Sequence, residues 1–273
     1  MNDRNVLTLR RVRSIGIQQG PSRRAAGRRR WPRPRWVAAV IGSAAVGVAA
    51  FLLAGGGSAP TGPRTLTPDQ ANRLAITRFR NYQAGGRAVT ITVPGSAGGL
   101  IITGSVDYRD KLGYGAVRGT GRDTSSDGLI EWTATTVYVH PMANTPADAP
   151  ARPPGSGWYG RPLQTSGSSL DSSLAIALSL GSDRPDNAEL LPQNGAAWVG
   201  HDRLHGRRVD VMTGPSARAT SGTADTVRYW IGSDGTMYRV HVGVASESQP
   251  VVIDFDTQKY IPVRPVPGVT PAR

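Results

Sequence analysis

The chain has 273 residues, with 32 Lys and Arg against 19 Asp and Glu, and it contains no cysteine. This length allows a sizeable hydrophobic core in one or two domains. The lack of cysteine excludes disulfides, thiolate metal sites, a thiol nucleophile and a lipidated cysteine. Of the net charge of +13, residues 1–35 supply +10, from eleven arginines and one aspartate, so the remaining 238 residues carry only +3. This distribution argues against nucleic acid as a partner.

An uncharged apolar segment follows the basic tail. Residues 36–54 form a run of 19 residues without a charge, about 28 Å long as a helix, which matches the hydrocarbon core of a bilayer. The arginines all precede it. The positive-inside rule therefore predicts a single-pass transmembrane helix at 36–54, with residues 1–35 as a disordered cytoplasmic tail and everything after residue 55 outside the cell membrane. The residues expected at the membrane interface, in contact with the lipid bilayer, are Arg28, Arg29, Arg30, Trp31, Arg33, Arg35 and Trp36.

The apolar segment is expected to remain as an uncleaved signal-anchor. Ser58-Ala59 resembles a cleavage site, but Pro60 follows directly, and the basic region is long for a signal peptide. Residues 55–66 are expected to form a flexible linker. Thr67-Pro68-Asp69 then predicts a helix with Thr67 as its N-cap, which runs to about Tyr82. The extracytoplasmic domain is thus placed at 67–268, with a short tail at 269–273.

The rest of this domain is predicted to be rich in strands. Alternating β-branched and aromatic residues indicate strands at 87–93, 100–108, 113–118, 129–140 and 251–256, and a hairpin at 226–242 around Asp234-Gly235. A Pro-rich loop at 141–157 precedes a helix at 170–180, a helical turn at 186–191 and a strand pair at 197–199 and 207–212. These elements predict an α+β fold, in which a long, largely antiparallel sheet carries a few helices on one face.

Three segments carry a resemblance to a known family. They are the hairpin Tyr229–Val240, the strand Val251–Asp256 that leads into a Pro-rich end, and Gly206–Val211. With the order of the elements, they resemble the lipoprotein-carrier (LolA/LppX-type) superfamily over roughly residues 67–268. The resemblance implies a curved sheet, a half-barrel around helices, with an apolar cavity for acyl chains. The chain departs from the usual pattern because it has neither a lipobox cysteine nor, by our interpretation, a cleaved signal.

No motif in the sequence predicts catalysis. A Gly-x-Ser-x-Gly elbow and a phosphate-binding loop are both missing. His201 and His205 are four residues apart, but Gly200 and Gly206 disfavour a helix, and in a strand the two rings would be about 13 Å apart. A surface loop is expected there instead of a metal site. No catalytic residue, cofactor or metal is predicted, although a Ser-His-Asp triad built from distant residues stays open.

Two further patterns concern carboxylates and aromatic side chains. Asp254 and Asp256 are expected as solvated carboxylates on the outer face of a strand. Aromatic residues of the domain either belong to its core or line an apolar cavity. The residues predicted to line such a cavity are Trp132, Tyr138, Trp158, Tyr159, Trp198 and Trp230.

The sequence therefore predicts a membrane-anchored protein that binds or carries a lipid or another apolar ligand without catalysis. Two alternatives remain: a cell-envelope interaction or sensor module that docks a protein partner, and an extracytoplasmic hydrolase. Whether residues 141–157 form a gating flap or a plain loop also stays open.

Overall fold

The computed structural model describes residues 62–95, 98–122, 124–215, 227–244 and 247–267. The chain divides into two compact units, Met1–Gly57 and Ser58–Arg273, and all described residues belong to the second. The predicted tail, transmembrane segment, membrane-interface residues and C-terminal tail lie outside the described residues, as does the linker up to residue 61. Among the residues that are described, no helix is long and apolar enough to cross a bilayer.

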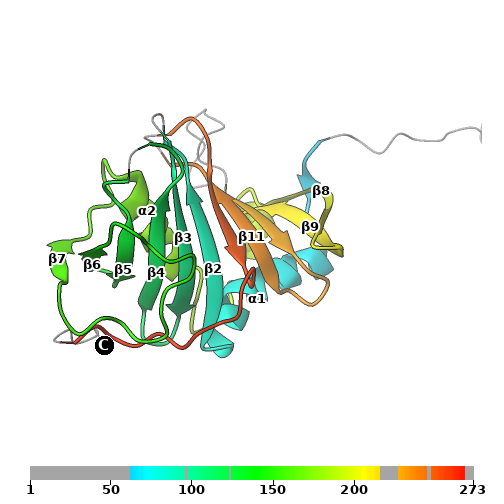
Figure 1. The fold of residues 1–273 in the computed structure, drawn as a ribbon. Helices are drawn as coiled ribbons and strands as arrows, with labels where there is room; N and C mark the ends of the chain where they lie inside the picture. Colours follow the sequence, from blue (N-terminus) through cyan, green and yellow to red (C-terminus); the bar gives the residue numbers. More distant parts are fainter. Residues whose placement is uncertain (1–61, 96–97, 123, 216–226, 245–246, 268–273) are drawn as a thin grey trace, which may run out of the picture. The chain divides into compact units, whose positions relative to one another are not determined.

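The described part of the chain folds around one sheet of twelve strands (Figure 1), in which every pairing is antiparallel. In chain order the strands are β1 (Arg64–Thr65), β2 (Gly86–Val93), β3 (Leu100–Asp107), β4 (Leu112–Gly119), β5 (Gly128–Trp132), β6 (Thr136–Pro141), β7 (Tyr159–Pro162), β8 (Ala197–Leu204), β9 (Arg207–Thr213), β10 (Arg228–Ile231), β11 (Met237–Val242) and β12 (Val251–Phe255). The predicted α+β class with an antiparallel sheet is confirmed.

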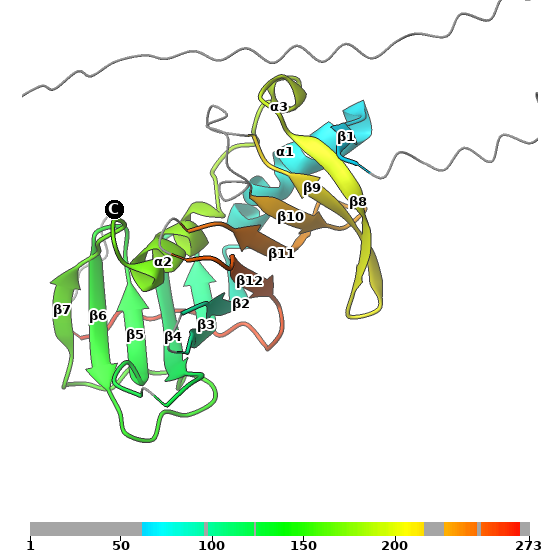
Figure 2. The ribbon, with the colours of Figure 1, turned by 90° about the horizontal axis from the view of Figure 1, so that it is seen from above.

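The order of the strands across the sheet is β1-β8-β9-β10-β11-β12-β2-β3-β4-β5-β6-β7. The last strand, β12, therefore pairs with β2 in the middle of the sheet. Between β7, at one edge, and β8, near the other, the chain forms the helices α2 (Ser169–Ser179) and α3 (Leu190–Gln193), and Figure 2 shows α2 crossing one face of the sheet on this path.

The first helix, α1 (Pro68–Gln83), begins as predicted. Thr67 forms a capping box with Gln70: the Thr67 hydroxyl accepts from the Gln70 amide at 3.3 Å, and the Gln70 side chain accepts from the Thr67 amide at 3.0 Å. Pro68 occupies the first turn, where its missing amide hydrogen has no helical partner to lose. Local chemistry alone thus fixes this end of the helix.

The helices α1 and α2 pack on the same face of the sheet, here called the inner face. Directly paired residues share a face, and the row Met212, Tyr229, Val240, Ile253 and Ile91 runs through such pairs from β9 to β2. At one end of this row, Met212 belongs to the apolar cluster formed with α1. At the other end, Ile91 belongs to the main core, to which α2 contributes. The opposite face is called the outer face.

Three predicted elements differ from the observed ones. The single strand expected at 129–140 is two strands, because the turn at 133–135 is held by the Thr133 hydroxyl, which accepts from the Thr136 amide at 3.0 Å. The helical turn expected at 186–191 forms at 190–193. The strand expected at 197–199 continues to Leu204.

Candidate ligand-binding site

Side chains of the sheet and of α2 pack together in the inner core. Trp132 illustrates the packing: it is fully buried, and its indole N–H donates to the carbonyl of Leu174 in α2 at 3.1 Å. Its ring lies over Gly113 on the paired strand, where an added Cβ would come within 2.2 Å of the ring. Trp132 therefore joins β5 to α2 as a core residue, and it lies on the face where the family resemblance implied a cavity.

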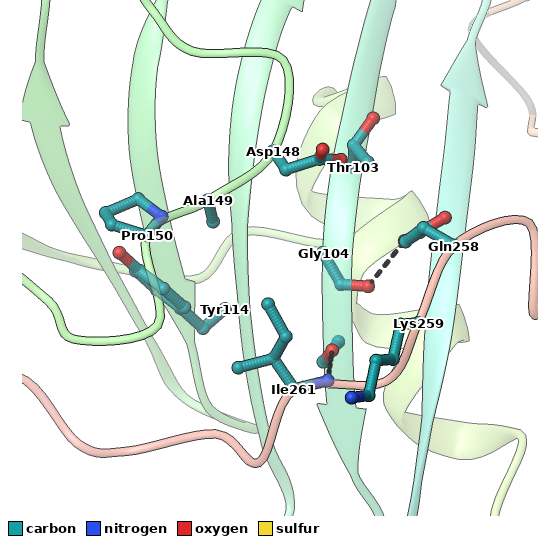
Figure 3. Close-up of a pocket in the computed structure, with 10 residues that line it drawn as sticks. Thr103, Gly104, Tyr114, Asp148, Ala149, Pro150, Gln258, Lys259 and Ile261 are labelled. Atoms are coloured by element: carbon teal, nitrogen blue, oxygen red, sulfur yellow. Dashed lines mark hydrogen bonds between the residues drawn. The ribbon is translucent and has the colours of Figure 1, made fainter.

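A pocket of about 150 Å³ lies on the outer face. Its floor is formed by Thr103, Gly104 and Ser105 of β3 and by Tyr114 of β4. Two segments outside the sheet close over it (Figure 3): the Pro-rich cover, residues 142–158, and the C-terminal strap, residues 257–266. The cover contributes Asp148, Ala149 and Pro150, and the strap contributes Gln258, Lys259 and Ile261.

Polar contacts along its length fasten the C-terminal strap to the sheet, beginning at Thr257, whose hydroxyl lies 2.7 Å from that of Thr90. The Gln258 side chain donates to the carbonyls of Val89 and Gly104 at 3.0 and 2.9 Å. The Ile261 amide donates to the Ser105 hydroxyl at 3.2 Å (Figure 3). Further along, the Val266 amide donates to Oε2 of Glu131 at 2.9 Å. The strap is thus held by hydrogen bonds in which the side chain comes either from the strap or from the sheet, and it adds no strand to the sheet.

The Pro-rich cover is held mainly by apolar packing. Met142, Ala149 and Trp158 pack on a small outer-face cluster formed by Tyr114 and its neighbours. The Trp158 ring lies 6.4 Å from the Tyr114 ring, and its N–H donates to the carbonyl of Pro154 within the cover itself at 2.9 Å. Two hydrogen bonds hold the ends of the cover: the Met142 amide donates to the Asp127 carbonyl at 3.1 Å, and Nδ1 of His140 in β6 lies 3.0 Å from the Gly157 carbonyl oxygen. Residues 148–150, over the pocket, make no hydrogen bond to the described residues, so this part of the cover can shift without breaking one.

Two buried polar side chains lie at the site: Tyr114 in the lining of the pocket and Glu131 on the neighbouring strand. They are directly paired across β4 and β5, and both are buried. The Tyr114 hydroxyl and Oε1 of Glu131 have no hydrogen-bond partner among the described residues. Burial, reinforced by the nearby Glu131, raises the pKa of Tyr114, so its phenol remains a hydrogen-bond donor. Burial raises the pKa of Glu131 to about 7, against the opposing effect of the Val266 amide.

The arrangement of the site can therefore bind a ligand, but it offers few groups for a catalytic reaction. A single buried phenol can donate one hydrogen bond to a ligand once the cover moves away from it. Beside it on the neighbouring strand, the Glu131 carboxyl is divided between its neutral and charged forms near pH 7. Among the described residues, no group of three or more His, Asp or Glu side chains is placed to hold a metal ion.

The structure does not gather the predicted ligand-lining residues in one place. Trp158 alone among them contacts a wall of the pocket, through Tyr114. The others are distributed as follows: Trp132 in the inner core, Tyr138 half-buried on β6, Tyr159 68% exposed on β7, Trp198 half-buried on β8 and Trp230 buried on the outer face of β10. Sequence reasoning missed Tyr114 and Glu131, although Glu131 stands out as the one charged residue in the apolar strand β5.

Two other sequence expectations need correction. His201 and His205 do not lie in a surface loop: His201 is in strand β8, and His205 is in the turn that follows, at φ 49°. Asp254 and Asp256 are not a pair of solvated carboxylates on one strand face. Asp254 is bound by Arg239 on the outer face at 2.5 Å, whereas Asp256 lies beyond β12 at φ 55° and pairs with Arg87.

The sequence matches no family model and no curated protein. Its fold is similar to that of lipoprotein LppX from Mycobacterium tuberculosis, with 10% identity and a TM-score of 0.39, over 71% of this chain and 98% of that one. A DUF1329 family protein from Desulfovibrio piger has 12% identity and a TM-score of 0.32, over 71% and 94%. An uncharacterised protein from Thermus thermophilus has 10% identity and a TM-score of 0.33, over 66% and 80%.

The match to LppX agrees with the resemblance predicted from the sequence. At these identities and TM-scores, the similarity concerns the arrangement of the chain and carries no argument about a ligand or an activity.

Proposed function

We propose that this protein is an extracytoplasmic binding protein, anchored in the cell membrane by residues 36–54, that holds a lipid or another apolar ligand reversibly and without catalysis. The observation that carries the proposal is the outer-face pocket with the unpartnered hydroxyl of Tyr114. A buried hydroxyl without a hydrogen bond costs about 1–3 kcal/mol. A ligand recovers this free energy when its acceptor reaches the hydroxyl, which lies beside Pro150 (Figure 3) and becomes accessible when this part of the cover shifts.

The size of the pocket determines how such a ligand would bind. A volume of about 150 Å³ is smaller than the roughly 300–1,000 Å³ of sites for drug-sized ligands, but a dry cavity of about this size can take a benzene ring. A ring or a short stretch of acyl chain therefore fits the closed site. A longer chain requires Ala149 and Pro150 to move outward, which would expose the apolar side chains of Ala116 and Leu129 beneath the cover.

Native mass spectrometry of the full-length chain tests this proposal. The probes are palmitic acid, a monopalmitoyl lysophospholipid and a membrane lipid extract. Ala149→Trp fills the pocket from the half-buried position at its wall, whereas Ala151→Trp adds the same bulk at an exposed position of the same cover. We expect the wild type and A151W to retain a bound lipid and A149W to lose it.

Two results would reject the proposal. Equal lipid retention by A149W and the wild type, with both folded by circular dichroism, would show that the lipid binds elsewhere. No retention of any probe by the wild type would exclude lipid carriage altogether.

The packing of the inner face favours a second candidate function. Because Trp132 and Leu174 are tightly packed core residues on the face where the resemblance implied an acyl cavity, the fold can also serve as a module that docks a cell-envelope protein. This candidate predicts a lipid-free mass for the wild type, together with one reproducible partner after chemical cross-linking in the native membrane.

A further inference from the structure

The hairpin formed by β8 and β9 carries a cluster of basic side chains on one side. His201 pairs directly with Asp210, and Arg203 pairs directly with Arg208. Residues two apart on a strand, and residues directly opposite each other, lie on the same face of a sheet. All four side chains therefore lie on one side of the hairpin, the side that faces α1.

The imidazole of His201 is held in a fixed orientation. Its Nδ1 lies 2.6 Å from Oδ1 of Asp210, and the indole N–H of Trp198 donates to the same oxygen at 3.1 Å. Arg73 of α1 pairs with the other oxygen of Asp210 at 2.7 Å. The Asp210 side chain is 7% exposed and that of His201 is 47% exposed. The buried carboxylate thus fixes the Nδ1 side of the ring and leaves Nε2 as the free nitrogen.

The two arginines opposite each other have no counter-ion. Like charges directly across an antiparallel pair destabilise a sheet, and Arg203 and Arg208 are both exposed. Within the described part of the chain, neither guanidinium makes a hydrogen bond or an ion pair. With His201 and Asp202, they line one open depression of the surface.

The carboxylate of Asp202 does not neutralise these arginines, because it is engaged elsewhere. Its Oδ2 accepts from the indole N–H of Trp230 at 2.8 Å, and its Oδ1 accepts from the backbone amide of Arg203 at 2.7 Å. The hydrogen bond from Trp230 is the main cause that lowers the pKa of Asp202. The depression therefore combines two unpaired guanidinium groups with an oriented imidazole.

We propose that His201, Arg203 and Arg208 form a binding site for a phosphate-bearing ligand, either a soluble phosphate ester or a phospholipid headgroup. Guanidinium forks match the oxygens of a phosphate with paired hydrogen bonds, and Nε2 of His201 adds a third group. A bound phosphate also removes the repulsion between Arg203 and Arg208. This site is separate from the Tyr114 pocket and does not depend on its function.

The test uses the full-length chain and two probes. Isothermal titration with glycerol 3-phosphate measures binding of a soluble ester. Co-sedimentation with phosphatidylcholine vesicles, with and without phosphatidylglycerol, measures binding of a headgroup. The double variant Arg203→Gln/Arg208→Gln should weaken binding by about tenfold or more, because charge-assisted hydrogen bonds are lost. His201→Gln should weaken it by a smaller factor.

A matched control removes the same amount of charge from the other side of the sheet, at one position on β9 and one on β10. Arg207 lies over the Tyr238 ring at 5.7 Å, and Arg228 is exposed on β10, so Arg207→Gln/Arg228→Gln should leave binding unchanged. The basic tail, which carries +10, and the proposed anchor at 36–54 are the same in every variant, so their contribution to vesicle binding cancels in the comparison.

The outcomes distinguish a soluble phosphate ester from a phospholipid headgroup, and both of these from the failure of the proposal. Saturable binding of the ester that R203Q/R208Q weakens supports a soluble ligand. A loss by R203Q/R208Q on phosphatidylglycerol vesicles alone supports a headgroup. Equal losses in R203Q/R208Q and R207Q/R228Q would show a general charge effect and overturn the site, as would the lack of specific binding in both assays.

Discussion

Two buried carboxylates, one on each face of the sheet, have pKa values that are shifted in opposite directions. Asp171, at the start of α2, is fully buried and accepts two hydrogen bonds from Arg161 at 2.6 and 2.7 Å and one from the Gln164 amide at 2.8 Å. Burial alone would raise the pKa of Asp171, but these hydrogen bonds reverse the effect and lower it. Glu131, equally buried on the outer face, has one hydrogen bond, and its pKa rises to about 7.

This contrast concerns individual groups and not whole faces of the sheet. Asp171 and the indole of Trp132 are matched by partners on the inner face, which is the arrangement that stabilises a fold, whereas the Tyr108 hydroxyl on the same side is buried without a partner. On the outer face, the hydroxyl of Tyr114 and one oxygen of Glu131 are buried without partners. Unmatched buried groups weaken a fold, and they are the groups that a ligand can satisfy.

The largest expected effect comes from comparing two tryptophans. Trp132→Ala should lower the free energy of unfolding by about 3–5 kcal/mol, because it leaves a cavity between β5 and α2 and removes a buried hydrogen bond. Trp158→Ala, in the Pro-rich cover, should cost about 1–2 kcal/mol, because Trp158 is only half-buried. Urea unfolding of both variants measures the two values, and equal losses would contradict the difference in burial between Trp132 and Trp158.

Glu131→Gln is expected to have a smaller, pH-dependent effect. The pKa of Glu131 rises from 4.5 in the unfolded chain to about 7 in the fold. The folded state then binds more protons, so stability falls as the pH rises from about 4.5 to 7, by at most about 1.4 kcal/mol per pH unit. Since glutamine cannot ionise, E131Q should match the wild type near pH 4.5 and exceed it by about 1–2 kcal/mol at pH 8.

Thermal unfolding at several pH values provides the measurement for Glu131. Asp171→Asn serves as the opposite control, because the pKa of Asp171 is lowered: the wild type should be more stable than D171N at neutral pH and should lose this advantage as the pH falls below 3.8. If E131Q followed the wild type at every pH, the carboxyl of Glu131 would not be the group that titrates.

Local patterns in the sequence predicted most of the elements of the fold. The capping box at Thr67 and Gln70 and the turn at Asp234-Gly235 depend on neighbours along the chain, so the sequence shows them directly. The edge strands β1 and β7 were missed. β1 has two residues, and β7 contains glycine and proline and follows a Pro-rich stretch, so neither shows the alternation that predicts a strand.

The candidate site could not be predicted in the same way, because it is formed by contacts between distant segments. The strap at 257–266 reaches Ser105 and Glu131 across more than a hundred residues. The aromatic side chains do not define a site by themselves, since size and ring chemistry do not distinguish the core position of Trp132 from the position of Trp158 in the cover. Burial without a partner, the property that marks Tyr114, becomes visible only in three dimensions.

Tyr114→Phe is expected to give the smallest change in stability, and it tests the effect of the hydroxyl on ligand affinity without a change in folding. Tyr114→Phe removes a buried hydroxyl that has no partner, so the free energy of unfolding should stay unchanged or rise by up to about 1 kcal/mol. Tyr108→Phe is the matched control, because the Tyr108 hydroxyl is also buried without a partner, on the inner side of the fold. Both variants should keep their stability, but only Y114F should lose affinity for a lipid that carries a hydrogen-bond acceptor, by several-fold in native mass spectrometry. An equal loss of affinity in Y108F, or no loss in Y114F, would mean that the unpartnered hydroxyl of Tyr114 does not contact the ligand.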